Sequence, residues 1–507
     1  MTHASKASAV PGSRSLEETL ALFTAGAAVA EAHEFRLDAL DRLGIPLWGV
    51  FVWATDGDFS DGYGYGSSEL AARVGAWGEV LENHWATVSL RALPKRRASF
   101  ASLPGAIDPR TLCLDAGAAY DPEAPRLWTM GKRWPSGESV WLPLEAAAIG
   151  LADAAEVPAE ERLFMPITNG LGAGSSLEQA LAHGVLEQVQ RDGDSVTFRA
   201  LDAGVRLTLD DVTDPDTRAL LRTLDEAGIE IFAKLAEVTL GMPVVYVVGY
   251  DRELARAPFN LSLSACGEAA HPDREVALRK ALNEFVSSRA RKRFMHGTLD
   301  DMRRVAPAKY CARVESDPLH GDESRALESV LAWARMTRKE YFEVVVDPIF
   351  RERSHRAFAS LPSASPEDTS SAPALLALLD RRLRAEGSEV LYFDFTPPGA
   401  EFHVVKACCP RLEVETMSYN RIGRRNLERL LRRAAEEPAL AGLVGIGAPP
   451  AGSRPRAIHL TEADRAALGG DAWLDPAAIE RVVGRLYALY REPNGHTVGK
   501  MRAREGR

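Results

Sequence analysis

Three stretches of the chain combine a turn with a following predicted helix that carries carboxylates. The turns cover residues 62–68, 168–175 and 267–273, and each contains glycine or proline. The helices after them carry these polar groups: Glu79 and Glu82; Glu187, Gln190 and Arg191; Glu284, Ser287 and Arg289. Residues three apart share a helix face, so each helix can direct an acid and a second polar group at one point. If the three helices meet, they form an acidic pocket edged by arginines, which suits Mg²⁺ and a polyphosphate.

A simpler interpretation of each stretch has to be weighed against this one. A single Glu-x-x-Glu on a helix is usually a solvated face, and Gly-Ser before a helix is usually a turn with an N-cap. The repetition of the pattern, with arginine in two of its three copies, favours the functional interpretation.

Composition sets limits on the class of protein. The chain has 507 residues, enough for two or three domains or one large composite domain. The net charge of -10 argues against general binding of nucleic acid. The N-terminus has no apolar signal segment, and no apolar run approaches the length of a membrane span, so we expect a soluble, cytoplasmic protein.

The cysteines agree with a reducing compartment. There are five, without a Cys-x-x-Cys spacing, so neither a zinc site nor a disulfide framework is expected. Cys408 and Cys409 are adjacent in a largely apolar run, which predicts buried strand thiols rather than a redox pair.

The elements that must position the acids repeat along the chain. A turn that leads into a strand is predicted at residues 43–52, 240–248 and, more weakly, 396–405. The segments 220–232 and 375–393, which precede the second and third copies, both indicate a helix that ends in glycine and a following strand. We interpret this as diverged repetition of an α+β unit.

Other segments lie outside the repetition. Residues 1–13 are predicted to form a flexible tail, and residues 16–33 an amphipathic helix. Residues 94–160 have little periodicity and indicate an insertion, and the Ser- and Pro-rich residues 353–373 indicate a mobile loop. Residues 431–507 are predicted to be a helical C-terminal extension.

The ordered motifs resemble those of the YcaO superfamily from about residue 14 to 430. The similar segments are Gly-x-Gly to Glu-x-x-Glu at 64–82, the glycine turn and helix at 169–192, residues 271–284, and Leu-Tyr-Arg-Glu-Pro at 489–493. The resemblance implies an α+β fold of repeated helix and sheet units around a central nucleotide cleft, with ATP and Mg²⁺ as cofactors. The implied domain covers residues 14–430.

The resemblance also assigns roles to individual residues. The implied metal ligands are Glu79, Glu82, Glu187 and Gln190. The implied nucleotide-binding residues are Arg14, Thr19, Ser175, Gln179, Arg191, Glu284 and Arg289. The chemistry is consistent, because carboxylates bind hard cations and guanidinium groups bind phosphate oxygens in pairs.

Several positions depart from the family pattern. Gln190 stands where the family usually has Glu, and Ser175 and Gln179 stand where it has an Asn and Glu pair. Tyr65 replaces a basic residue, and Ser287 replaces Gln. Fewer carboxylates weaken a site whose affinity depends on ligand charge, so a degenerate scaffold that binds nucleotide or peptide without catalysis stays open as an alternative.

The function that the resemblance implies is ATP-dependent activation of a peptide backbone amide in ribosomal peptide biosynthesis. A nucleophile adds to the amide carbonyl, the oxyanion takes phosphate from ATP, and phosphate leaves, which gives azoline, thioamide or amidine products. The implied partners are a precursor peptide and a TfuA-like or leader-binding protein, and a homodimer is considered. No Pro-x-Pro-x-Pro tail and no leader-binding segment before residue 14 are recognised, and no Ser-His-Asp set or P-loop is found.

Overall fold

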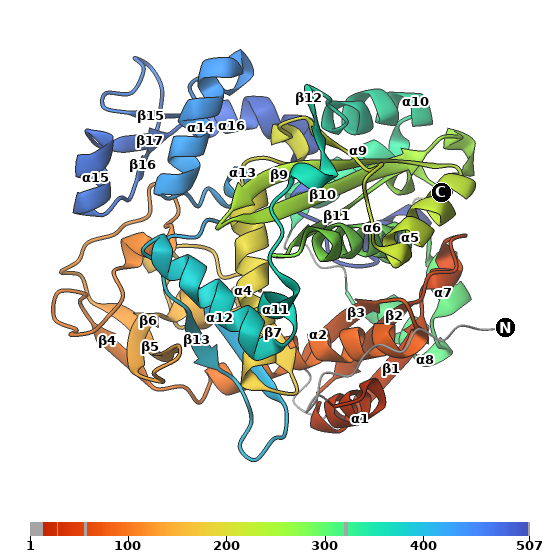
Figure 1. Cartoon of the computed structure of the whole chain (residues 1–507), viewed down its shortest axis with the longest axis horizontal. Helices are drawn as coiled ribbons and strands as arrows, with labels where there is room; N and C mark the ends of the chain where they lie inside the picture. Colours follow the sequence, from red (N-terminus) through yellow and green to blue (C-terminus); the bar gives the residue numbers. More distant parts are fainter. Residues whose placement is uncertain (1–13, 28, 55–57, 319–322, 505–507) are drawn as a thin grey trace.

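The computed structural model describes residues 14–27, 29–54, 58–318 and 323–504, so the predicted tail at 1–13 lies outside the described residues. The fold is α+β, as predicted, with four sheets and many helices (Figure 1). All strand pairs within these sheets are antiparallel except β8 with β12. No described helix is both long and apolar enough to span a bilayer.

The strands form a three-stranded sheet, a five-stranded sheet, a six-stranded sheet and a second three-stranded sheet. In that order they are β1 (Glu31–Arg36), β2 (Leu47–Trp53) and β3 (Phe59–Tyr65); β8 (Val205–Thr208), β9 (Ile229–Thr239), β10 (Met242–Asp251), β11 (Ser264–Ala270) and β12 (Ser354–Ala357); β4 (Lys95–Ala98), β5 (Arg126–Arg133), β6 (Ser139–Pro143), β7 (Leu171–Gly174), β13 (Leu391–Asp394) and β14 (His403–Cys408); β15 (Val444–Ile446), β16 (Arg456–Ile458) and β17 (Ala472–Leu474).

The helices cover the sheets and link them. They are α1 (Leu16–Gly26), α2 (Glu69–Leu90), α3 (Leu144–Ala147), α4 (Leu177–Asp194), α5 (Pro215–Glu226), α6 (Arg274–His296), α7 (Leu299–Val305), α8 (Ala308–Ser316), α9 (Ser324–Arg335), α10 (Arg338–Tyr341), α11 (Pro366–Thr369), α12 (Ala372–Ala385), α13 (Thr416–Tyr419), α14 (Arg424–Glu436), α15 (Glu462–Leu468), α16 (Pro476–Val483) and α17 (Thr497–Arg504). Figure 1 shows α4 running through the centre of the molecule.

Three strand and helix pairs correspond to the three repeated stretches of the sequence. They are β3 with α2, β7 with α4, and β11 with α6. Each helix begins at a side-chain cap: Ser68 accepts from Ala71 N, Ser176 from Gln179 N, and Asp273 from Glu275 N. These caps satisfy backbone donors at the helix start and fix where each helix begins.

Glycine allows each of the three strands to touch the backbone of its helix. A Cβ on Gly64 would lie 1.8 Å from Ala72 O, one on Gly172 would lie 2.1 Å from Ala180 O, and one on Gly267 would lie 2.1 Å from Ala281 O. No side chain fits in that space, so glycine is required at these three positions. This close contact places the following turns of each helix beside the strand backbone.

The three pairs are arranged in a ring. Strands β3, β7 and β11 each lie at one edge of their sheet. Each helix also contacts the glycine-bearing strand of the next pair: α2 contacts β7, α4 contacts β11, and α6 contacts β3. The three helices therefore surround one common region, which the predicted acidic pocket requires.

The predicted repeated units are confirmed. The segment 220–232 forms the later part of α5 and the start of β9, and within 240–248 residues 242–248 belong to the hairpin partner β10. The segment 375–393 forms most of α12 and the start of β13, and the strand predicted within 396–405 begins later, as β14. The strand predicted at 43–52 is β2.

Some local predictions differ from the structure. The helix predicted at 16–33 ends at Gly26, and residues 31–36 form β1, because pairing with β2 overrides the helical propensity of the Ala-rich segment. Residues 94–160 contain β4, β5 and β6, and β5 pairs with β13, so they form part of the six-stranded sheet. Residues 353–373 contain β12 and α11.

The C-terminal region is helical and also carries the small sheet β15–β17. The domain boundaries themselves stay a prediction.

Candidate nucleotide and metal site

The same hydrogen bond occurs in all three strand and helix pairs. Glu79 Oε2 accepts from Tyr63 N at 2.6 Å, Glu187 Oε2 accepts from Gly170 N at 3.0 Å, and Glu284 Oε2 accepts from Glu268 N at 2.8 Å. In each case a helix carboxylate caps a backbone N–H of the segment that the helix covers. The bond fixes one oxygen of each acid and leaves its second oxygen for another ligand.

Glu82 links two of the pairs. Its Oε1 accepts from Ala173 N, at 2.7 Å, so a residue of α2 caps the outer edge of β7. Its side chain is 13% exposed. Glu79 and Glu82 are three residues apart on α2, and the first is bonded within its own unit while the second is bonded to the next. The predicted pairing of these two acids on one helix face therefore also joins the first unit to the second.

The carboxylates of this cluster are buried and lie close enough to raise one another's pKa. Burial, with the neighbouring Glu187 carboxylate contributing, raises the pKa of Glu79 to about 7 and that of Glu82 to about 8. Burial, with Glu268 nearby, raises the pKa of Glu284 to about 7. Buried carboxylates that repel one another are stabilised in the charged form by a nearby cation. The cluster therefore favours a bound divalent cation.

Two arginines lie among these acids. Arg191 is 3.6 Å from Glu187 and 3.1 Å from Glu268, as expected for the arginine of the second repeat. Arg291 was not predicted. Burial lowers its pKa, but the carboxylates of Glu492, Glu79 and Glu284, with Tyr63, outweigh that effect and raise it. Arg291 follows Glu284 by seven residues, about two full turns, and this spacing could have identified it.

Arg289 does not face the acids. Its guanidinium is buried and donates to Asp41 at 2.8 Å and to Asp251 at about 3.4 Å. Five residues along a helix correspond to a rotation of about 140°, so Arg289 and Glu284 lie on different faces of α6. The structure therefore does not bring Arg289 together with the other predicted nucleotide-binding residues.

Ser175 and Gln179 bond to each other at the start of α4. Ser175 donates its backbone N–H and its hydroxyl to Gln179 Oε1, at 3.0 and 2.9 Å. Gln190 is partly buried, three residues after Glu187 on the same helix. Tyr65 is near two of the acids, because burial and the carboxylates of Glu284 and Glu79 raise the pKa of its phenol.

Arg14 and Thr19 lie at the N-terminal helix, which packs on α2. Arg14 forms an ion pair with Glu401 at 2.7 Å, and Thr19 donates its hydroxyl to Ser15 O at 2.8 Å. Both bonds belong to the start of α1, and among the described residues neither side chain has a hydrogen bond or ion pair with the carboxylates of the cluster.

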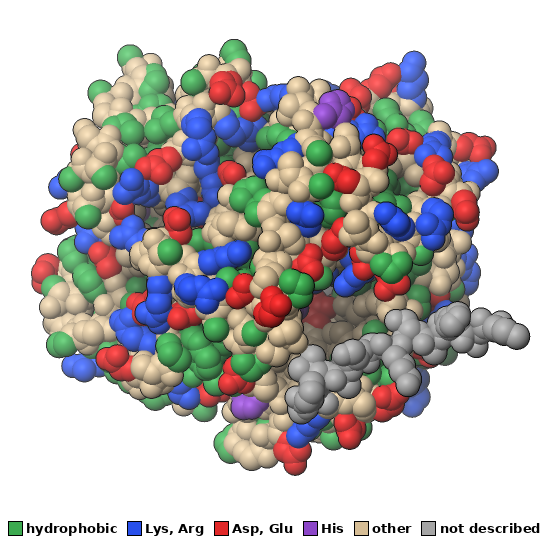
Figure 2. Space-filling view, viewed as in Figure 1, with side chains coloured by type: hydrophobic (Ala, Val, Ile, Leu, Met, Phe, Trp, Pro, Cys, Tyr) green, Lys and Arg blue, Asp and Glu red, His purple; other side chains and the backbone are tan. Residues whose placement is uncertain are grey.

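The cluster suits a metal that arrives with its own ligands. Within the described ranges, no three His, Cys, Asp or Glu side chains lie close enough to hold a metal ion alone. Mg²⁺ is usually held by one or two carboxylates together with phosphate oxygens and water. Figure 2 shows a hollow with acidic side chains at depth, over the region that α2, α4 and α6 surround in Figure 1. These residues therefore fit Mg²⁺ bound to a polyphosphate.

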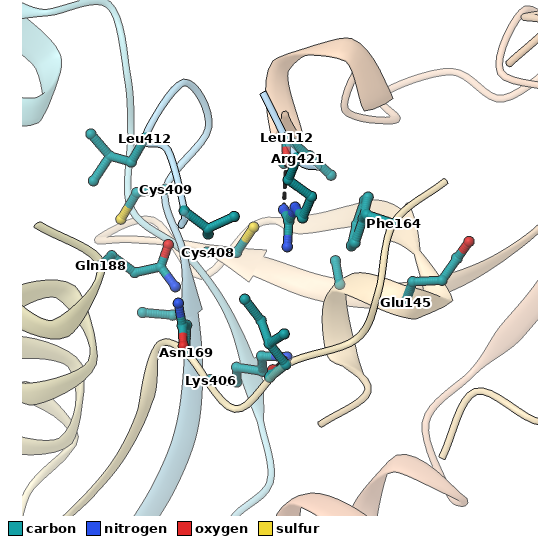
Figure 3. A pocket seen from close by; sticks show the side chains of 14 residues that line it. Leu112, Glu145, Phe164, Asn169, Gln188, Lys406, Cys408, Cys409, Leu412 and Arg421 are labelled. Atoms are coloured by element: carbon teal, nitrogen blue, oxygen red, sulfur yellow. Dashed lines mark hydrogen bonds between the residues drawn. The ribbon is translucent and has the colours of Figure 1, made fainter. Parts of the chain in front are cut away.

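A separate small cavity lies on another face of α4 (Figure 3). Its volume is about 40 Å³, and Gln188, Asn169, Lys406, Cys408 and Arg421 are among its lining residues. Gln188 is one residue after Glu187 and is therefore turned about 100° away from the acids. Both adjacent cysteines are free thiols, and they are partly or fully buried at the end of β14, as predicted.

Lys406 is expected to make stability depend on pH. It is 4% exposed, it donates to Ala148 O and Ile167 O at 2.6 and 2.7 Å, and burial lowers its pKa to about 7. The unfolded state then binds more protons than the folded state between about pH 7 and 10.5, so this group makes the free energy of unfolding rise with pH in that window. Its largest contribution is about 1.4 kcal/mol per pH unit.

Urea unfolding of the wild type and of Lys406→Met at pH 7 and pH 9 checks this expectation. On going from pH 7 to pH 9, the free energy of unfolding of the wild type should rise by about 1 kcal/mol or more relative to that of Lys406→Met. The cysteine thiols titrate in both proteins and cancel in the comparison. A difference that stays constant with pH would show that Lys406 is charged in the folded protein.

The chain belongs to the YcaO family. The sequence model of the family described as "YcaO cyclodehydratase, ATP-ad Mg2+-binding" matches residues 63–413, a stretch that begins within β3 and includes the three acid-bearing helices α2, α4 and α6. ATP and Mg²⁺ are thus the cofactors of the family, in agreement with the geometry of the carboxylate cluster.

Similar proteins are found by sequence and by fold. An uncharacterized protein of Methanothermobacter thermautotrophicus is 29% identical over 397 residues, which cover 76% of this chain and 90% of the relative. The structure of YcaO from Methanopyrus kandleri bound with AMPPCP and Mg²⁺ matches with a TM-score of 0.54 and 20% identity, covering 81% of this chain and 94% of that one.

A heterocyclase in complex with substrate and cofactor matches with a TM-score of 0.59 and 16% identity over 81% of this chain. The chain spans about half of that heterocyclase, 54% of its length. At these identities the two solved structures show a shared fold.

Proposed function

We propose that the chain uses ATP and Mg²⁺ to activate a backbone amide of a peptide substrate. The observation that carries this proposal is the convergence of Glu79, Glu82, Glu187 and Glu284 from three helices, each bonded to a backbone N–H of a glycine-rich strand or of the turn before it. The family description as a cyclodehydratase supports the reaction class. The products would be azoline, thioamide or amidine groups in a ribosomally made peptide.

The residues divide into two sets by their chemistry. Glu79, Glu82 and Glu187, with Gln190 one turn further along α4, would hold Mg²⁺ because hard cations prefer charged oxygen ligands. Arg191 and Arg291, with Glu284 on α6, would orient the phosphates and balance their charge. ATP supplies the phosphoryl group that turns the amide oxygen into a leaving group. The contribution of the chain is therefore positioning and charge neutralisation.

A second candidate is a scaffold that binds nucleotide or peptide without catalysis. One observation favours it. The carboxamide oxygen of Gln179 accepts both hydrogen bonds from Ser175, so this side chain closes a turn and supplies no charge to a metal. Gln190 is likewise uncharged. The two candidates differ in ATP turnover and agree in nucleotide binding.

Partners follow from the reaction. A precursor peptide is the proposed substrate, and a TfuA-like or leader-binding protein is the proposed means of delivery. A homodimer and a cytoplasmic location remain part of the proposal. ATP turnover by the chain alone is expected to be near background and to rise when peptide and partner are added.

Calorimetric titration with a non-hydrolysable ATP analogue tests nucleotide binding. We expect binding that requires Mg²⁺, because the carboxylates repel phosphate until a cation lies between them. The control is the same titration with EDTA. An absence of heat and of thermal stabilisation at millimolar analogue with Mg²⁺ would contradict both the enzyme and a scaffold that binds nucleotide.

A further inference from the structure

A pocket lined by five arginines lies on the side of α6 that faces away from the acids. The lining arginines are Arg42, Arg256, Arg289, Arg293 and Arg304, with Asp41 as the acid among the lining residues. The cavity has a volume of about 220 Å³. The chain as a whole has a net charge of -10, so this concentration of positive charge is local.

The pocket has a buried floor and an exposed rim. Arg289 is 6% exposed and is held by Asp41 and Asp251, so it is fixed in position. Arg293 forms a wall, with bonds to Asp301 and to Leu40 O at 2.7 and 2.8 Å. Arg256 and Arg304 are exposed. The five guanidinium groups come from three parts of the sequence, at residue 42, at residue 256 and at residues 289–304.

The positive charge is only partly neutralised: the carboxylates of Asp41, Asp251, Asp301 and Glu253 pair with four of the five arginines, and Arg304 has no carboxylate partner among the described residues. Asp251, which bonds both Arg42 and Arg289, is 1% exposed and lies behind the two arginines rather than in the pocket. Among the described residues, Arg304 donates to the carbonyl of Ala39 at 2.7 Å and to no carboxylate. A guanidinium group has five donors, so these bonds leave donors for a ligand.

The position on α6 separates this pocket from the nucleotide site. Arg289 and Arg293 are turned about 140° and 180° from Glu284 around the helix axis, whereas Arg291 is turned about 20°. Arg291 accordingly faces the acids, and Arg289 and Arg293 line the pocket. Helix α6 therefore contributes to the predicted nucleotide site on one face and to the arginine pocket on the opposite face.

We propose that this arginine pocket is a second anion site that binds the phosphate or diphosphate group of a small molecule. Several guanidinium groups that converge on one cavity suit a ligand that concentrates its charge, and phosphate presents several oxygens to different forks. Carboxylates spaced along a peptide would place one charge in the pocket at a time. A cavity of about 220 Å³ is many times the roughly 10 to 15 Å³ that a single bound water needs, so it has room for a diphosphate.

Calorimetric titration of the full chain with pyrophosphate in EDTA tests the proposal, because the absence of free Mg²⁺ suppresses binding at the acidic cluster. The rim variant is Arg256→Gln with Arg304→Gln. The matched control is Arg252→Gln with Arg303→Gln, which removes two exposed charges from neighbouring positions that do not line the pocket. Inorganic phosphate, ADP and hexaglutamate are titrated in parallel to identify the ligand chemistry.

We expect pyrophosphate to bind the wild type, the control variant and Glu79→Gln alike, and to bind the rim variant at least tenfold more weakly. Thermal unfolding of all four proteins verifies that they are folded. The proposal is overturned by the absence of pyrophosphate binding, by equal binding in the rim and control variants, or by loss of binding in Glu79→Gln. Tighter binding of hexaglutamate than of pyrophosphate would assign the pocket to an acidic peptide instead.

Discussion

Glu79→Gln should lower the Mg²⁺-dependent affinity for ATP at least tenfold and lower ATP turnover at least 100-fold. Glutamine keeps an oxygen that accepts the hydrogen bond from Tyr63 N, at 2.6 Å in the wild type, so the local structure is retained. It removes one charge from the carboxylate cluster, and Mg²⁺ sites depend on ligand charge. Losing one preorganised charge at a phosphoryl-transfer site costs roughly two to three orders of magnitude in rate.

Two measurements are needed because affinity and turnover report different things. Titration with a non-hydrolysable analogue gives the affinity, and phosphate release in the presence of precursor peptide and partner gives the turnover. Glu178→Gln is the matched control, since this acid is on the same helix as Glu187 but in the first turn of α4. If Glu79→Gln binds the analogue as tightly as the wild type, Glu79 does not belong to the metal site. If the wild type binds the analogue but shows no ATP turnover, the protein is the non-catalytic scaffold.

Gly64→Ala should lower the free energy of unfolding by about 3 kcal/mol or more. The added Cβ would lie 1.8 Å from Ala72 O and 2.2 Å from Ala76 N, and both are backbone atoms of α2. Overpacking a close contact usually costs about 1 to 3 kcal/mol, and a rigid helix backbone cannot move aside as a side chain can. The helix must separate from β3, which also displaces Glu79.

Gly44→Ala is the control for this substitution. Gly44 has a φ of +66° and no atom within 4 Å of the added Cβ, so alanine there meets conformational strain without a clash. A cost of about 1 to 2 kcal/mol is expected from the left-handed conformation alone. Urea unfolding of both variants gives the comparison. Similar costs for the two would show that the contact between β3 and α2 can relax.

The sequence predicted the parts of the site that repeat. Glycine- or proline-containing turns, each followed by a helix with an acid and a second polar group three apart, predicted α2, α4 and α6 and the acids Glu79, Glu82, Glu187 and Glu284. What it could not predict is how each acid is held, because the bond from Glu82 to Ala173 N joins two units that are distant along the chain. Unlike an N-cap, a hydrogen bond from a side chain to the backbone of a distant segment leaves no local pattern of residue types.

Other differences have specific physical causes. The orientation of Arg289 follows from helical rotation, and applying that rotation to the whole helix would have selected Arg291 instead. Residues 94–160 lack periodicity because their strands are short and joined by turns, yet β5 still pairs with β13. Residues 31–33 are predicted as the end of a helix but begin β1, because pairing with β2, and not their own composition, decides their conformation.

The ring of three units has a consequence for the timing of synthesis. The last contact of the ring, between α6 and β3, joins residues about 200 positions apart. At roughly 5 to 20 residues per second on the ribosome, the first unit waits about 10 to 40 seconds for its final neighbour. During that interval the edge of β3 lacks α6, and an edge strand that lacks its cover can pair with another chain. The interval before α6 is made is therefore when the nascent chain most needs protection from association.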